Sequence, residues 1–545
     1  MMIAACTPSV PDGATDVERA ARVLPDNDGA TLPPNIAPLC FEIQEEGDRF
    51  VTRLSTRGGR ELVVGGRSVG IDVAEWHQLL ADAAGDTLWT DVYARQGGRW
   101  QHFRRMANPV VRDSIDPYIT YRLIRPSYVC YEELSLVERN VENFDERTFY
   151  SNMALSRDDN GQCVNCHVPQ RQGQTGRSQF HARQAYGGTV LIDGTDIRKV
   201  NLKTDSTLSA GVYPAWHPTL PLIAYSVNET GQAFHTLDPQ KIEVIDYASD
   251  LILYDPGQNE VSSITRTSRD YESFPTWSPD GRTLYYISAH HDPVGTDIDV
   301  DLDQNYQTLH YNIYARAFDP SARRFGPARL VFDAEALGKS ASTPRISPDG
   351  RWLLFSLADY GQFHIWHRSA DLCVVPLDPE DCDSTMSSTC GTRQFHVWNS
   401  SVPRVELTLT SRTEEANSTE SDSYHSWSSN GRWILFSSRR MDGNYTRLYL
   451  SYFDRQGHAH RPVLLPQRRP HLYAELFRSF NAAEWMTQPV ASGRSGLSRA
   501  LQEALRRDAR QARYAGSALA VPETDSVATQ TRITKQNYHN IYEND

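Results

Sequence analysis

The chain of 545 residues has no apolar run approaching the length of about 18 residues that a membrane-spanning helix needs. Basic residues are fewer than acidic ones, 55 Lys and Arg against 68 Asp and Glu, and the formal charge of -13 argues against a nucleic-acid-binding surface. There is no Gly-x-Ser-x-Gly elbow, no phosphate-binding glycine loop and no His-Glu-x-x-His pair. These absences leave no indication of hydrolase or kinase chemistry.

A short cysteine motif is the most informative feature that is present. Cys163, Cys166 and His167 form a Cys-x-x-Cys-His pattern, which is the attachment signature of c-type haem. In such a site each thiol adds to one haem vinyl group, and the adjacent histidine becomes the proximal iron ligand. A thioredoxin-like dithiol needs a βαβ context and a zinc site needs a second ligand pair at similar spacing, and the sequence has neither. The motif therefore predicts one covalent haem c per chain.

The distal side of the iron is open to several interpretations. His181 lies a short distance after the motif and is the first choice for a distal ligand, because a bend in the chain brings it back over the ring. Met153 lies shortly before the motif and is the second choice, since His and Met are the usual axial partners. A more distant histidine and an open iron site are the remaining alternatives.

The beginning of the sequence resembles the end of a bacterial lipoprotein signal. Small residues after Ile3 precede Cys6, the residue that is lipidated after cleavage in such signals, although the usual charged and apolar regions are missing. Residues 1–34 are expected to form this lipoprotein-like start and a linker rich in Pro, Asp, Thr and Ala. The alternative is a flexible tail with a free Cys6.

The other cysteines favour an oxidising compartment. Cys40 and Cys130 flank one predicted β domain, and Cys373, Cys382 and Cys390 lie close together in one predicted loop. Structural disulfides and covalent haem both indicate an extracytoplasmic location, in the periplasm or on the outer membrane.

Before the repeats, two regions are predicted. Residues 35–138 contain short alternating strands such as 49–54 and 119–124, separated by glycine-rich turns, and are predicted to form an immunoglobulin-like β-sandwich with a short helix near Trp76. Residues 139–186 are polar and irregular and form the haem c attachment segment. This segment is too short to bury a haem alone, so the haem must rest against the sandwich, the repeat region or both.

From residue 187 to about 490 one pattern recurs: an aromatic-Pro-x-Trp-like segment, an Asp-Gly-type turn and an apolar strand. Each copy predicts one four-stranded propeller blade. The four copies are 213–218, 274–281, 343–350 and 424–431, with a degenerate fifth at 480–485. The pattern resembles the TolB-like β-propeller repeat, which implies a mainly β fold of four to six blades, six being the family precedent. Residues 491–545 are predicted to be a basic helix and a C-terminal tail.

Several histidines belong to this repeat region. His425 takes the place that proline fills in the other copies, at the start of a predicted innermost strand near the central channel. His235, His364 and His367 lie in neighbouring segments. Two interpretations stand: a histidine-lined channel or rim that binds metal or contacts haem, and ordinary structural histidines.

An acidic insertion is a minor candidate for calcium. Asp297, Asp299, Asp301 and Asp303 alternate there, but an EF-hand loop starting at Asp297 has no glycine at its sixth position and no glutamate at its twelfth. A solvated acidic loop is the default interpretation.

Together, the haem motif and the repeats resemble TolB-like envelope lipoproteins of Bacteroidetes-type bacteria that carry one haem signature before the propeller. The resemblance implies this architecture. The first functional hypothesis is an extracytoplasmic monohaem c-type cytochrome that acts in electron transfer or redox sensing, with the propeller as a docking platform for a redox partner or envelope protein. The alternatives are a haem-dependent enzyme acting on a small molecule, and an envelope scaffold with a structural haem. Fold analogy alone does not choose among them.

Overall fold

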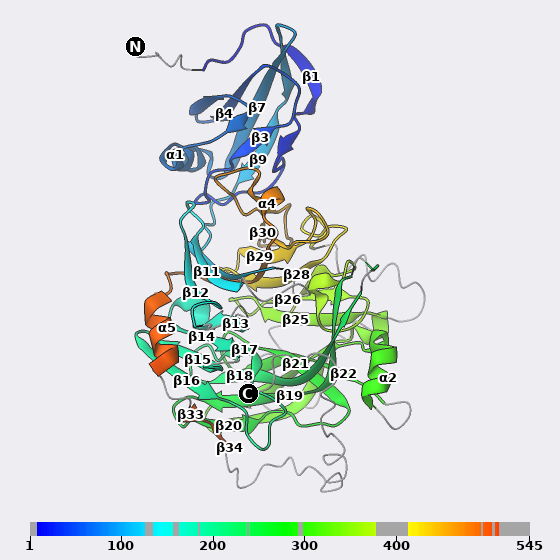
Figure 1. The fold of residues 1–545 in the computed structure, drawn as a ribbon. Coiled ribbons are helices and arrows are strands. Elements are labelled where there is room, and N and C mark those ends of the chain that lie inside the picture. Colours follow the sequence, from blue (N-terminus) through cyan, green and yellow to red (C-terminus); the bar gives the residue numbers. More distant parts are fainter. Residues whose placement is uncertain are drawn as a thin grey trace.

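The repeated strand pattern folds into a ring of six sheets, and a separate β domain stands at one side of this ring (Figure 1). The computed structural model describes residues 8–125, 134–155, 163–183, 186–235, 237–238, 240–292, 298–377, 412–491, 494–503 and 507–511. Within these ranges no helix has both the length and the apolar composition that crossing a membrane requires.

The N-terminal domain combines two sheets with one helix. Its larger sheet has the order β1-β8-β7-β4-β5, with β9 also paired to β7, and its smaller sheet has the order β2-β3-β6. The elements are β1 (Thr15–Ala20), β2 (Val23–Leu24), β3 (Phe41–Ile43), β4 (Arg49–Thr56), β5 (Glu61–Gly65), β6 (Ser68–Val69), α1 (Val73–Ala83), β7 (Asp86–Gln96), β8 (Arg99–Arg104) and β9 (Met106–Val110).

Helix α1 supplies much of the core of this domain. Asp72 caps it by accepting the backbone N–H of Ala74, and the buried Trp76 donates its indole N–H to the carbonyl of Ile36 over 2.8 Å. The predicted short helix near Trp76 is present as α1, whereas β1, which runs parallel to β8, lies in residues that were expected to be a linker. The immunoglobulin-like arrangement stays a prediction. Alternating apolar residues indicate strands but do not say which strands pair.

Each of the six ring sheets is built mainly from consecutive strands. The first four are β10 (Tyr118–Ile124), β11 (Leu134–Asn140), β12 (Glu146–Ser151) with β32 (Ser479–Met486); β13 (Val164–Pro169), β14 (Arg177–Ala182), β15 (Gly188–Asp193), β16 (Asp196–Asn201); β17 (Val212–Trp216), β18 (Ile223–Phe234), β19 (Ile242–Asp255), β20 (Glu260–Ser263); and β21 (Asp270–Trp277), β22 (Thr283–His290), β23 (Asn312–Asp319), β24 (Arg324–Phe332). The last two are β25 (Ser340–Ile346), β26 (Trp352–Ala358), β27 (Asp371–Pro376); and β28 (Asp422–Trp427), β29 (Trp433–Ser438), β30 (Arg447–Tyr452), β31 (Val463–Leu464).

The innermost strands close the ring. In order, β32, β13, β17, β21, β25 and β28 each contact the next, and β28 contacts β32 again. Strand β32 comes from the C-terminal part of the chain and pairs with β10, so the two ends of the propeller meet in one sheet. The predicted β-propeller is therefore confirmed, and it has six blades.

The propeller begins earlier than the sequence indicated. Strand β10 was expected in the sandwich and residues 139–186 in a separate haem segment, but β10, β11 and β12 form one blade and β13 starts the next. The ring thus runs from residue 118 to residue 486. The reason is that these two blades lack the aromatic-Pro-x-Trp signature that marks the others, since Cys166-His167 and Ala482-Ala483 stand in its place.

The N-terminal domain is fixed to the ring through the blade that contains β28. Asp116 accepts the backbone N–H of Ser429 over 2.7 Å, and Trp433 donates its indole N–H to the carbonyl of Asp113 over 2.9 Å. A continuous hydrophobic core joins Trp76 of the domain to Trp433 of the blade.

Short elements connect the blade strands or follow the last of them. The remaining elements of the described chain are η1 (Gln170–Gly173), α2 (Ile298–Asn305), η2 (Tyr306–Thr308), η3 (Glu335–Leu337), η4 (His364–Trp366), α4 (Leu472–Glu475), α5 (Arg494–Glu503), β33 (Arg507–Asp508) and β34 (Arg510–Gln511). The predicted basic helix is α5, whose Leu497 and Leu501 are buried in a core shared with β12 and β15. Strands β33 and β34 extend two blades at their outer edges.

Candidate functional site in the propeller channel

One backbone bend recurs in all six innermost strands. At this bend a residue other than glycine takes a positive φ, and the strand pairing shifts register beside it. The six residues, with their φ values, are Cys166 (56°), Tyr213 (46°), Phe274 (48°), Thr343 (50°), Tyr424 (48°) and Ala482 (49°). The haem motif therefore occupies a defined position of the six-fold repeat.

Side chains from different blades converge at this level. The backbone N–H of Tyr213 faces the thiol of Cys166, and the rings of Tyr213 and Phe274 lie 4.0 Å apart between centroids. Burial raises the pKa of Cys166, Tyr213 and Tyr424. A negative charge on Cys166 raises the pKa of both tyrosines further. Strands β13, β17 and β28 thus bring one cysteine and two tyrosines, all partly buried, to the same level of the ring.

Both motif thiols are free. Cys163 lies just before β13 and is buried, and the amide nitrogen of Asn165 lies 2.8 Å from its sulfur. The backbone carbonyl of Cys163 accepts the N–H of Arg183 over 2.9 Å, which fixes the start of the motif to the end of β14. Cys166 then presents its thiol at the bend.

His167 follows the bend and takes the position that proline fills in three other blades. Its side chain is buried, with 4 % exposure, and neither ring nitrogen makes a well-aligned hydrogen bond to the described residues. Burial lowers the pKa of His167 to about 4, the charge of Arg122 lowers it further, and the backbone of Thr120 opposes the shift. A neutral imidazole with unengaged nitrogens has the chemistry of a metal ligand.

His425 takes the same repeat position on β28. It is also buried, and its ring nitrogens likewise lack a well-aligned partner in the described chain. Burial lowers the pKa of His425 to about 3, with a further contribution from Arg345 and opposition from the backbones of Thr343 and Leu354. Its strand, β28, is the innermost strand of its blade, as predicted from the sequence.

The two distal-ligand candidates lie in different surroundings. His181 is on β14, directly opposite Asn165, and its Nδ1 is 3.2 Å from the hydroxyl of Thr189. Burial lowers the pKa of His181 to about 3. Met153 follows β12 and is 38 % exposed. Neither strand β12 nor strand β14 is the innermost strand of its blade. A role of His181 or Met153 as the distal iron ligand stays a prediction.

Arginines surround the motif, and sequence reasoning did not find them. Arg122 and Arg183 both lower the pKa of Cys166. Arg345 on β25 forms an ion pair of 2.9 Å with Glu484 on β32, two strands that flank β28. No sequence pattern marks these arginines, because a single arginine in an alternating strand looks like an ordinary solvent-facing residue.

A long hairpin packs on the bend of the neighbouring inner strand β28. Strands β18 and β19 extend beyond their blade, and Ile242 and Val244 pack against Ile365, Trp366 and Tyr424. Tyr424 is the bend residue of β28, and a charge on Cys166 raises its pKa further. His235 lies near the hairpin tip, where its N–H donates to the carbonyl of Lys241.

The acidic insertion uses its carboxylates internally. Asp299, Asp301 and Asp303 lie on α2, where Asp301 contacts His291 over 2.7 Å and Asp303 accepts the hydroxyl of Tyr247 over 2.5 Å. Among the residues that the structure describes, no group of three or more His, Cys, Asp or Glu side chains is arranged to hold a metal ion. Asp297 and Cys6 lie outside the described residues.

No protein-family model and no curated protein matches the chain. Among solved structures, it is similar to hydrazine synthase of Kuenenia stuttgartiensis (11 % identity, TM-score 0.37), over 70 % of this chain and 49 % of that one. An oligogalacturonate lyase of Vibrio parahaemolyticus matches at 10 % identity and TM-score 0.30, over 80 % of this chain and 100 % of that one. A prolyl endopeptidase matches at 12 % identity and TM-score 0.31, over 64 % and 42 %. The chain thus spans about half of the hydrazine synthase chain, and scores this low assign no function.

Proposed function

We propose that the protein is an extracytoplasmic c-type cytochrome whose single haem is bound covalently in the propeller channel, where it serves electron transfer or redox sensing. The supporting observation is the position of Cys166 and His167 on an innermost strand, directly after Cys163, at the bend that Tyr213 and Tyr424 occupy in two other blades. Periplasmic or outer-membrane location, with a lipid on Cys6, belongs to the same proposal.

The residues present fit the cofactor. Cys163 and Cys166 are free thiols able to anchor it, and His167 has unengaged ring nitrogens for iron. Arg122 and Arg183 place two positive charges beside Cys166, matching the two carboxylates that a haem carries. Bound there, a haem supplies reversible one-electron chemistry. The surrounding blades keep bulk water away and hold the side chains in place.

A second candidate function is catalysis on a small molecule. The observation that favours it is the packing of the hairpin of β18 and β19 on Tyr424, the bend residue of β28. A site beneath such a hairpin would suit a small substrate better than a large redox partner, because an electron-transfer protein profits from a haem edge close to its docking surface. In this version the iron keeps one open coordination position.

Absorption spectra distinguish the two functions. The protein is purified from cells with c-type haem maturation, and spectra are recorded oxidised and reduced, with and without carbon monoxide. A low-spin spectrum that carbon monoxide leaves unchanged supports electron transfer, and replacement of His181 or Met153 then identifies the distal ligand. A high-spin spectrum that shifts supports a catalytic or sensing iron. Absence of covalent haem contradicts both functions and leaves a propeller scaffold.

A further inference from the structure

A buried carboxylate without a basic partner lies on the long hairpin. Asp246 on β19 is 1 % exposed, and among the described residues it forms no ion pair with lysine, arginine or histidine. A charge on Asp246 raises the pKa of Tyr213, the bend residue of β17, so the carboxylate lies near the inner part of that blade. Burial raises the pKa of Asp246 itself to about 7, because an unbalanced negative charge is costly inside a protein.

Side chains from three other segments converge on Asp246. Its Oδ1 accepts the side-chain amide of Asn228 on β18 over 3.1 Å and that of Gln362, in the loop after β26, over 3.3 Å. Its Oδ2 accepts the hydroxyl of Tyr311, just before β23, over 3.1 Å. All four side chains are buried. The cluster thus joins the hairpin to loops of the next two blades along the ring.

Two oxygen atoms of this cluster are unpartnered. Oδ1 of Asn228 and Oε1 of Gln362 are buried, and neither has a hydrogen-bond partner among the described residues. Carboxylate and amide oxygens are the ligands that hard cations prefer. Because the cluster has a single acidic side chain, it is a different kind of site from the groups of three or more His, Cys, Asp or Glu side chains that the described residues lack. One carboxylate with two unpartnered amide oxygens therefore has the donor chemistry of a hard-cation site.

The spacing of these atoms suits one ion. A half-turn of its last torsion exchanges the nitrogen and the oxygen of an Asn or Gln amide. After that turn, the oxygens of Asn228 and Gln362 would take the positions of the nitrogens, which lie 3.1 and 3.3 Å from Oδ1 of Asp246. Two oxygens that are each about 2.3 Å from a cation, and nearly at a right angle around it, are separated by a similar distance.

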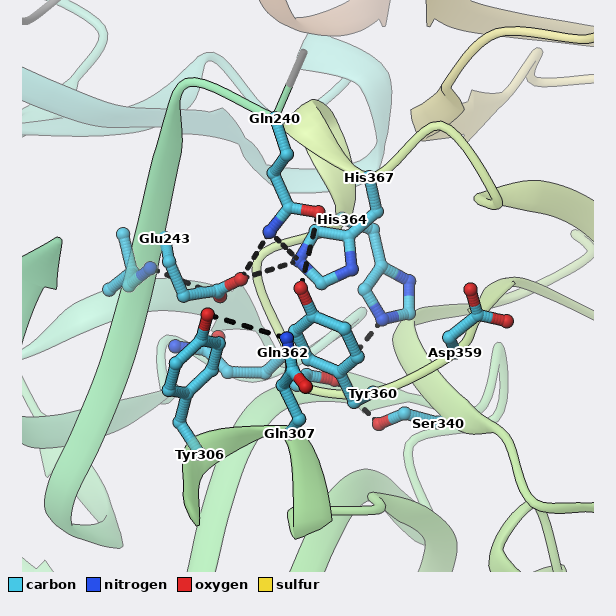
Figure 2. A network of polar contacts seen from close by, with 12 residues as sticks. Gln240, Glu243, Tyr306, Gln307, Ser340, Asp359, Tyr360, Gln362, His364 and His367 are labelled. Carbon is cyan, nitrogen blue, oxygen red and sulfur yellow. Dashed lines mark hydrogen bonds and ion pairs between the residues drawn. The ribbon is translucent and has the colours of Figure 1, made fainter. Parts of the chain in front are cut away.

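The other buried carboxylate of the hairpin is already engaged. Glu243 on β19 accepts the side-chain amide of Gln240, and its carboxylate lies 3.0 Å from Nε2 of His367. Figure 2 shows this network, with Glu243 on the hairpin and Gln362 and His367 on the facing segment. Asp246 is therefore the carboxylate that still needs a counter-charge. A monovalent ion supplies one positive charge and leaves no buried excess, which a divalent ion would do.

We propose that the cluster around Asp246 binds one monovalent cation of about the size of sodium, with Asn228 and Gln362 supplying amide oxygens. The ion balances the buried carboxylate and ties the hairpin to the loops of the next two blades, so it stabilises the folded ring. The haem motif supplies none of these ligands. The proposal therefore goes beyond the proposed function and does not depend on it.

The test compares sodium chloride with choline chloride, at equal ionic strength, in denaturant unfolding of the full-length protein. Choline is too large for the site, so it controls for charge screening. Because only the folded protein has the site, the folded-to-unfolded ratio rises about elevenfold when sodium is tenfold above its Kd. Asp246→Asn removes the charge, and Gln362→Met removes one oxygen at nearly constant length. Each variant raises the sodium concentration needed for half of the effect at least tenfold, and the second keeps the test decisive if the first fails to fold.

The matched control is Asp301→Asn, which changes a buried carboxylate that already has a histidine partner, His291 at 2.7 Å. We expect the wild-type response to sodium in this variant. Equal stability of the wild type in sodium and in choline overturns the proposal, as does an Asp246→Asn response equal to that of the wild type. A stronger response to calcium chloride than to sodium chloride overturns the assignment of a monovalent ion. These measurements use no haem signal, so a failure of the proposed function is distinguishable from a failure here.

Discussion

Strands β13 and β28 carry the same structural feature with different chemistry. Each has a buried histidine directly after a left-handed residue, at the position where three other blades have proline. In both strands burial lowers the pKa of the histidine well below its usual value, and both histidines lack well-aligned hydrogen bonds in the described chain. The left-handed residue is Cys166 in β13 and Tyr424 in β28.

This difference shows what would distinguish the proposed haem-binding strand from an ordinary blade strand. A histidine in the proline position is compatible with the repeat, because His425 occupies it without a cysteine motif. Among the innermost strands, only β13 carries a cysteine at the bend, Cys166, with a second cysteine, Cys163, directly before it. The same substitution made at His167 and at His425 therefore separates a role in haem binding from a role in blade packing.

The largest difference is expected when the two histidines are truncated. His167→Ala removes the proposed iron ligand, and the fraction of protein with a six-coordinate haem spectrum falls at least about tenfold. His425→Ala leaves that spectrum unchanged, because β28 has no thiol. Absorption spectroscopy of both purified variants gives the measurement. Equal spectra for the two variants would contradict a ligand role of His167.

The next effect concerns acid stability. The pKa of His425 is about 3 in the folded protein and near the usual value of a histidine in the unfolded chain. When the pH falls below that usual value, the unfolded chain therefore binds a proton at His425 that the folded protein does not bind. Stability is therefore lost as pH falls, by about 2 kcal/mol at pH 5. His425→Pro, which introduces the residue of three other blades, removes this loss. Denaturant unfolding at pH 8 and pH 5 measures it.

The control for that prediction is a histidine with ordinary exposure in another part of the fold. The control variant is His458→Gln, because the side chain of His458 is about half exposed. Glutamine is chosen instead of proline because a proline at this position would change a turn. We expect the wild-type pH dependence in this variant. A pH dependence in His425→Pro that equals the wild type would show that His425 is not the group responsible.

The smallest effect is expected from the arginines. Arg122 acts on Cys166 and His167, whereas Arg345 is paired with Glu484 beside Tyr424. Arg122→Gln removes a positive charge that has no ion pair among the described residues, close to the proposed haem, so the redox equilibrium is expected to shift about fivefold toward the oxidised form, as for a charge interaction of about 1 kcal/mol. Arg345→Gln shifts it less, because Glu484 offsets that charge. Spectroelectrochemistry of both variants provides the comparison.

The sequence was informative where the repeat is regular. The aromatic-Pro-x-Trp copies predicted the propeller, and the degenerate copy at 480–485 is the closing strand β32. It was uninformative at Cys166-His167, where the motif hides the repeat, so β13 was assigned to the haem attachment segment 139–186 instead of a blade. Arg122 and the cluster around Asp246 were out of reach for a physical reason: their surroundings depend on which strands and loops meet, and local patterns do not encode that.

The central claim is that haem is bound covalently to β13, and intact mass under denaturing conditions tests it most directly. The protein is produced with c-type haem maturation, beside a Cys163→Ala, Cys166→Ala double variant. We predict one added haem per wild-type chain and none in the double variant. A wild-type mass equal to that of the polypeptide alone would contradict the account.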